Sequence, residues 1–172
     1  MVLCGVECVQ NIAKYLNVPV KKIHTSENNV VASDSLIKNQ TVEGFITIIQ
    51  SLVKSSKCQD IFGANQITEA LTIQWLEYAI LYINYADIPV NAKRVLKELN
   101  VALKSNTYIT GTNKTIADIA LYYSLHSVMN GLSQQEQGTY VNVSRWFDNI
   151  QQEEKLRNKL NIVNFDLMHL YI

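Results

Sequence analysis

The segment that most constrains the fold covers residues 108–146, where turn-forming and helix-capping residues precede a long apolar stretch. Gly111 permits a turn, and Thr115 and Asp118 have the Ser/Thr-x-x-acid spacing of a capping box. In such a box the threonine hydroxyl accepts from the backbone N–H three residues on, and the carboxylate accepts from the N–H of the cap residue. The spacing therefore predicts a structural cap and a helix that begins directly after Thr115.

The sequence after Ile67 has the periodicity of helices and no strand signal. Apolar residues at intervals of three and four predict a helix over residues 68–86, with Thr68 as its N-cap, and a second helix from Asn91. A short connection that closes at Pro89 forces two consecutive helices to pack antiparallel. The second half of the chain is therefore predicted to be an all-helical bundle.

The first part of the chain has a mixed pattern. Apolar positions from Val6 to Leu16 predict a helix that ends before Pro19. Residues 20–38 hold short β-branched pieces separated by Ser, Asn and Asp, which indicates strands and turns. Residues 41–54 then predict a helix with Thr41 as its N-cap. The order of elements is therefore helix, strands, helix.

Residues 58–66 include the single Gly63 and are the predicted linker, because the strand signal ends there. The expected domains are residues 1–57 and residues 67–172, separated by this linker. The chain has 172 residues and is 48% hydrophobic, which is enough to bury a substantial core. A globular protein is therefore expected.

Charge and hydropathy exclude two classes of partner. The 15 basic and 15 acidic side chains cancel, so no net field attracts the chain to nucleic-acid phosphates. The longest apolar runs are far shorter than the roughly 20 residues that span a bilayer. The first nine residues lack a basic leader with an apolar core, so a cytoplasmic location is expected, with no direct nucleic-acid or membrane partner.

The residue types that carry catalysis or bind metals are scattered. His24, His126 and His169 lie far apart and have no metal-ligand spacing. The three cysteines form no Cys-x-x-Cys pair, and the chain has no glycine-rich phosphate loop. We therefore predict no catalytic residue, no metal site and no cofactor.

The pattern Tyr-x-x-Gly-x-x-x-Thr-x-Ala-Asp, which begins at Tyr108, resembles the capping box in the helical domain of glutathione transferases. Residues 74–78 (QWLEY), 117–126 (ADIALYYSLH) and 140–147 (YVNVSRWF) narrow the resemblance to the glutathione-transferase-like auxiliary proteins of the multi-aminoacyl-tRNA-synthetase complex. This resemblance implies an α/β fold: a small, degenerate thioredoxin-like N-terminal domain followed by an all-α C-terminal domain.

The same resemblance provides a test for catalysis. The family's enzymes need a hydroxyl or thiol near the end of the first strand, and no good candidate stands out here. They also use a cis-proline before the third strand, but residues 28–36 contain no proline, and the Asp34-Ser35 pair imitates the family's acid-Ser pair at the wrong place. A non-catalytic scaffold is therefore expected. The alternatives are a glutathione-dependent transferase and an elongation-factor docking subunit.

The resemblance also implies two partner faces. The face used for two-fold pairing would contain Ile48, Ser51, Gln74, Tyr78 and Tyr82. The second face would centre on Arg145 and include Tyr140, Asn142 and Val143. The implied partners are methionyl-tRNA synthetase, glutamyl-prolyl-tRNA synthetase and other proteins of the synthetase complex, and a nuclear pool remains an open alternative.

Overall fold

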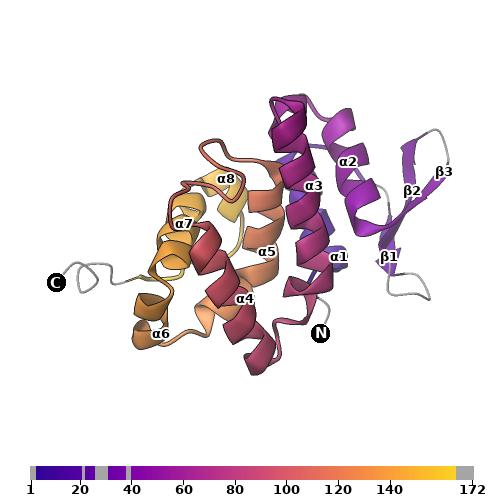
Figure 1. Cartoon of the computed structure of the whole chain (residues 1–172). Coiled ribbons are helices and arrows are strands. Elements are labelled where there is room, and N and C mark those ends of the chain that lie inside the picture. Colours follow the sequence, from indigo (N-terminus) through magenta and orange to yellow (C-terminus); the bar gives the residue numbers. More distant parts are fainter. Residues whose placement is uncertain (1–2, 21, 26–30, 38–39, 166–172) are drawn as a thin grey trace.

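A small sheet flanked by helices begins the chain, in a computed structural model that describes residues 3–20, 22–25, 31–37 and 40–165. The elements in chain order are α1 (Val6–Tyr15), β1 (Ile23–Thr25), β2 (Val31–Ile37), β3 (Gln40–Glu43) and α2 (Phe45–Ser55). The sheet has the order β1-β2-β3 with antiparallel neighbours, and Ile23 pairs with Ser33 while Ala32 pairs with Glu43. Helices α1 and α2 separate the sheet from the remaining helices (Figure 1). The predicted order of helix, strands and helix is confirmed.

The predicted helix over residues 41–54 is wrong at its start. Residues 40–43 form β3, and α2 begins only at Phe45, after Gly44 with a φ of 93°. A positive φ suits glycine and interrupts the helix there. Val42 lies in β3 and its side chain is buried. A β-branched residue such as valine is common in strands, so its apolar character did not distinguish a strand from a helix.

In its described part the second half contains helices and their connections, with one isolated β-bridge between Tyr108 and Gly111. The helices are η1 (Gln59–Phe62), α3 (Gln66–Leu81), η2 (Ile83–Tyr85), α4 (Pro89–Ala102), α5 (Ile116–Asn130), α6 (Gln134–Thr139), α7 (Val141–Gln151) and α8 (Glu154–Arg157). Helix α5 runs through the middle of the molecule, between α1 and α3 on one side and α4 and α7 on the other (Figure 1). The predicted helical bundle is confirmed.

Two helix starts differ from the predicted ones. The cap of α3 is Asn65, whose Oδ1 accepts from the Thr68 N–H at 2.9 Å, so Thr68 lies inside the helix. Helix α4 begins at Pro89 rather than Asn91, because a proline in the first turn lacks only an N–H that would have no helical partner.

The predicted capping box at the start of α5 is confirmed. Asp118 Oδ2 accepts from the Thr115 N–H at 2.9 Å and from the Thr115 hydroxyl at 3.2 Å. Its Oδ1 accepts from the Ile109 N–H at 2.8 Å and from the Trp146 indole N–H at 2.9 Å. Burial raises the pKa of the Asp118 carboxyl, while these donors act in the opposite direction by stabilising the carboxylate. Asp118 therefore joins the loop before α5, α5 itself and α7.

The two halves of the chain share one hydrophobic core. Asn84 Oδ1 accepts from the Cys4 N–H at 2.8 Å, and the Cys4 and Cys8 sulfurs lie 3.4 and 3.5 Å from the Ser124 hydroxyl oxygen. These contacts connect the start of the chain and α1 to η2 and α5. No helix in the described part of the chain is both long enough and apolar enough to cross a membrane.

Candidate protein interface

The outer side of α3 carries three of the residues predicted for the two-fold face. Gln74, Tyr78 and Tyr82 follow one another at one-turn intervals, and they line a shallow hollow of about 250 Å³ together with Trp75, Glu77 and Leu81. We call this set of six residues the α3 hollow. The structure therefore brings Gln74, Tyr78 and Tyr82 together on one surface.

Ring contacts and charged groups fix the aromatic side chains of the α3 hollow. The centroids of Trp75 and Tyr78 are 5.2 Å apart, and those of Tyr78 and Tyr82 are 5.0 Å apart. The Arg94 guanidinium carbon lies 5.2 Å from the centroid of the Tyr82 ring. Aromatic and cation–π pairs of this kind hold rings in place before a partner binds.

A carboxylate on α4 completes this arrangement. The Tyr78 hydroxyl donates to Glu98 Oε2 at 2.5 Å, and Arg94 Nε donates to Glu98 Oε1 at 2.9 Å. Burial and then the bond to Glu98 raise the pKa of Tyr78, while the Tyr78 and Arg94 donors lower the pKa of Glu98. Tyr78 therefore stays a neutral donor, and Glu98 stays an anion that links α3 to α4.

Large apolar side chains stay exposed at the end of α3 and shortly after it in the chain. Leu81 is 63% exposed, Tyr82 is 40% exposed, and Tyr85 and Ile88 follow at 53% and 51%. Large apolar side chains that gather on one exposed surface typically mark a protein–protein contact. Tyr85 and Ile88 were not among the predicted interface residues, because sequence periodicity does not show which apolar residues stay uncovered.

The prediction that Ile48 and Ser51 belong to this face is wrong. Ile48 has 0% exposed surface and Ser51 has 8%, and the Ser51 hydroxyl donates to the Thr47 carbonyl at 2.9 Å. Both residues lie on α2, which packs against α1, α3 and the sheet. Their side chains are covered within the chain itself and present almost no surface to a partner.

The predicted centre of the second face, Arg145, lies on α7 with an exposed side chain that also bonds inside the chain. Its Nη2 donates to the carbonyls of Leu103 at 2.8 Å and Asn106 at 2.9 Å, just beyond the end of α4. A cation there also interacts favourably with the helix dipole of α4. The guanidinium is thus held in one position, and its role toward a partner stays a prediction.

The other predicted residues of the second face differ in exposure. Val143 is wrong as a contact residue, because its side chain has 0% exposed surface. Asn142 is half-buried, its N–H donates to Asn100 Oδ1 at 2.9 Å, and its Nδ2 donates to the Asn100 carbonyl at 3.0 Å. Asn100 thereby anchors the start of α7. The sequence patterns did not indicate this role, because Asn100 lies 42 residues before Asn142.

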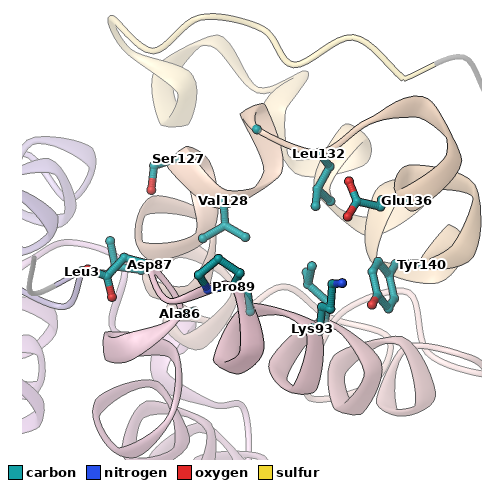
Figure 2. Close-up of a pocket in the computed structure, with 13 residues that line it drawn as sticks. Leu3, Ala86, Asp87, Pro89, Lys93, Ser127, Val128, Leu132, Glu136 and Tyr140 are labelled. Atoms are coloured by element: carbon teal, nitrogen blue, oxygen red, sulfur yellow. The ribbon is translucent and has the colours of Figure 1, made fainter.

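Tyr140 is half-buried and lines a groove of about 480 Å³ between α4, the end of α5 and α6. Figure 2 shows Pro89, Val128 and Leu132 directed into the groove, with Lys93, Glu136 and Tyr140 gathered toward one end. Glu136 accepts from the Ser133 N–H at 3.0 Å as part of a second capping box. The groove is mainly apolar. Tyr140 joins it to the remaining predicted second face, Tyr140, Asn142 and Arg145, which we call the α7 face.

Cys4, Cys8 and His126 make contacts inside the fold. Burial raises the pKa of Cys4 to about 11 and raises that of Cys8 as well, so both remain protonated thiols near neutral pH. His126 Nε2 lies 2.9 Å from the Asn161 carbonyl oxygen. The Asp34-Ser35 pair lies inside β2 rather than at a helix start, and His169 lies outside the described residues. The part of the chain that the structure describes holds no group of His, Cys, Asp and Glu suited to a metal ion.

The fold resembles that of known glutathione transferases. A glutathione S-transferase from Pichia kudriavzevii superposes with a TM-score of 0.72 at 16% identity, covering 89% of each chain. The glutathione-transferase-like domain of elongation factor 1-gamma from Saccharomyces cerevisiae superposes with a TM-score of 0.65 at 15% identity, covering 92% of this chain and 89% of that one. The predicted glutathione-transferase-like fold is confirmed.

Sequence comparison gives a narrower assignment. The family described as nuclear-export cofactor Arc1p matches residues 68–154. Eukaryotic translation elongation factor 1 epsilon-1 from Cricetulus griseus is 38% identical over 131 residues, which covers 76% of this chain and 75% of that protein. The tRNA-aminoacylation cofactor arc1 of Schizosaccharomyces pombe is 28% identical, covering 76% of this chain and 28% of that protein.

A synthetase is also among the relatives. The bifunctional glutamate/proline–tRNA ligase of Cricetulus griseus is 26% identical over 113 residues, covering 65% of this chain and 7% of that protein. The match to the epsilon-1 protein combines the strongest of these three identities with coverage of most of both chains. The chain therefore belongs to the family of eukaryotic translation elongation factor 1 epsilon-1.

Proposed function

We propose that this chain is a non-catalytic cofactor of aminoacyl-tRNA synthetases. It would act as a scaffold subunit of the multi-aminoacyl-tRNA-synthetase complex in the cytoplasm. It would link methionyl-tRNA synthetase to glutamyl-prolyl-tRNA synthetase by pairing with their glutathione-transferase-like domains. Relatives named as a tRNA-aminoacylation cofactor and as a glutamate/proline–tRNA ligase support this reading.

The α3 hollow and its surrounding apolar residues are the observation that carries the proposal. The rings of Trp75, Tyr78 and Tyr82 are held by contacts within the chain, so a partner can cover them at a small cost in side-chain entropy. Leu81 adds apolar area that water covers in the isolated chain. This combination is typical of an interface between proteins.

The α7 face would hold the second partner. Arg145 is fixed by two carbonyl contacts near the end of α4 and remains exposed. A pre-positioned guanidinium suits planar or bidentate contacts with a partner carboxylate. Because α3 and α7 lie on different sides of α5, the chain can contact two proteins at once (Figure 1).

A glutathione-dependent transferase is the alternative from a different functional class, since the fold is shared with such enzymes. The protonated states of Cys4 and Cys8 argue against a thiolate nucleophile. An elongation-factor docking subunit is the other alternative, and it differs from the scaffold only in the partner recovered.

Affinity capture from cytosolic lysate tests the proposal, with the full chain as bait. Enrichment of methionyl-tRNA synthetase and glutamyl-prolyl-tRNA synthetase is the expected result. Enrichment of elongation-factor subunits without either synthetase would support the docking alternative. Retention on immobilised glutathione together with conjugation of an electrophile would contradict the non-catalytic role.

The Arg145→Ala variant is expected to lose one synthetase partner and retain the other. Removing an interface anchor costs about 2 kcal/mol or more of binding free energy, or a roughly 30-fold weaker affinity. The variant also loses the two hydrogen bonds that Arg145 donates to the Leu103 and Asn106 carbonyls. Its free energy of unfolding should therefore fall by about 1 kcal/mol. Isothermal titration calorimetry and urea unfolding measure the two effects separately.

The matched control is Lys104→Ala, which removes a nearby exposed cation that has no hydrogen bond or ion pair among the described residues. It should bind both partners with unchanged affinity. If Arg145→Ala also binds both partners with unchanged affinity, the assignment of the α7 face is wrong.

A further inference from the structure

A polar cleft of about 600 Å³ lies on the molecule apart from the α3 hollow and the α7 face. Its walls come from α1, α5 and α8, and its lining residues are Asn11, Lys14, Tyr15, Tyr123, Glu154, Lys155, Arg157 and Asn158. We call it the α1–α8 cleft. None of these residues belongs to the groups that carry the proposed scaffold function.

Positive charge dominates the α1–α8 cleft. Lys14, Lys155 and Arg157 line it together with a single carboxylate, that of Glu154. Within the described residues, neither Lys14 nor Lys155 has a carboxylate within ion-pair distance. The chain as a whole is neutral, so this excess of cations is local. A concave surface lined by charges of one sign concentrates the field and attracts counter-charged ligands.

Neighbouring contacts hold Lys155 and Arg157 and leave their charges available. The Lys155 ammonium lies 5.0 Å from the centroid of the Tyr15 ring, and Arg157 Nη1 donates to the Gln151 carbonyl at 3.1 Å. Neither contact neutralises a charge. A second ammonium near the same ring, that of Lys114, is already paired with Glu153.

The walls of the cleft are joined before any ligand binds. The Tyr123 hydroxyl on α5 donates to the Leu156 carbonyl on α8 at 2.5 Å, and the Leu156 side chain has 0% exposed surface. Helix α8 is therefore held in place by this bond to α5 and by the burial of Leu156. A preformed site binds with a smaller loss of conformational entropy than one that must first order its side chains.

The chemistry of the lining favours phosphate over other anions. Three cations favour a ligand with more than one negative charge. A guanidinium also pairs well with phosphate oxygens. The Asn11 and Asn158 side chains add amide groups that can donate to further oxygens. A nucleic acid would need a basic surface that follows its backbone over several phosphates, whereas this charge is confined to one cleft.

The geometry points to a binding site for a small phosphorylated molecule with at least two negative charges in the α1–α8 cleft. Lys14, Lys155 and Arg157 pair with its phosphate oxygens. The site is independent of the synthetase contacts, and it gives the scaffold a small-molecule ligand in addition to its proteins.

Titration calorimetry of the full chain with inorganic pyrophosphate at low salt tests this site. We expect saturable binding with a dissociation constant below about 1 mM, and weaker binding as salt is added. The double variant Lys14→Gln/Lys155→Gln should bind at least about tenfold more weakly, because two charge-assisted contacts are lost. Without ligand, this variant should be no less stable than the parent chain, since like charges are removed.

The matched control is Lys97→Gln/Lys104→Gln, which removes the same charge from exposed positions outside the cleft. It should bind pyrophosphate as the parent chain does. Absence of saturable binding, or equal loss in both double variants, would overturn the site. Equal binding of malonate would overturn the assignment to phosphate, and binding of transfer RNA without pyrophosphate binding would overturn the assignment to a small molecule.

Discussion

Replacing Asp118 by alanine is expected to lower the free energy of unfolding by about 3 kcal/mol or more. The carboxylate has 0% exposed surface and accepts four hydrogen bonds, from Thr115, Ile109 and Trp146. Alanine would leave the Ile109 N–H and the Trp146 indole N–H without this acceptor inside the core. Urea unfolding followed by circular dichroism measures the loss.

The chain contains a natural control for this effect. Ser133 and Glu136 form the same kind of capping box at the start of α6, but Glu136 is only half-buried and its box lies on the surface. Glu136→Ala should therefore cost only about 1 kcal/mol. Equal losses in the two variants would show that Asp118 contributes a helix cap alone and does not connect α5 to α7.

The variant Leu81→Glu is expected to weaken binding of one synthetase by about 100-fold or more while the other still binds through the α7 face. A carboxylate at the α3 hollow would be desolvated in the complex, and the nearby Arg94 is already paired with Glu98. Leu81 is 63% exposed in the isolated chain, so the fold should be unaffected. Calorimetry with each purified synthetase measures the two affinities.

Ile162→Glu is the matched control, because Ile162 is 50% exposed and lies outside both faces. The same chemical change there should leave both affinities as they are. If Leu81→Glu binds both partners with unchanged affinity, the α3 hollow is not an interface of the proposed scaffold.

Sequence patterns predicted the helical half of this chain well, because the interactions that define these helices join residues that are close in sequence. The Thr115–Asp118 spacing specifies hydrogen bonds within one helical turn, so neighbouring residues contain all the information needed. The helix that begins near Thr68 was likewise predicted by periodicity, although its cap is Asn65. Both features depend on residues that are close in sequence.

Interface residues were harder to predict, because exposure depends on elements that are distant in sequence. Ile48 and Val143 have the spacing of residues on a helix face, but that spacing does not tell whether the face is covered. The contacts of Arg145 with Leu103 and Asn106 cross about 40 residues of chain, and no local pattern encodes them. Residues at one-turn intervals on α3, such as Tyr78 and Tyr82, were placed correctly on one surface.

The hydrogen bonds that Cys4 and Cys8 make with Asn84 and Ser124 have a consequence for how the chain unfolds. They lie within the single core, so neither the sheet-containing half nor the helical half can melt without exposing apolar surface of the other. A protein bound only to the native α3 surface, as proposed, would protect the distant sheet by mass action as well. Loss of that protein would expose both halves to proteolysis together, and the lifetime of this chain would then depend on the supply of the proposed partners.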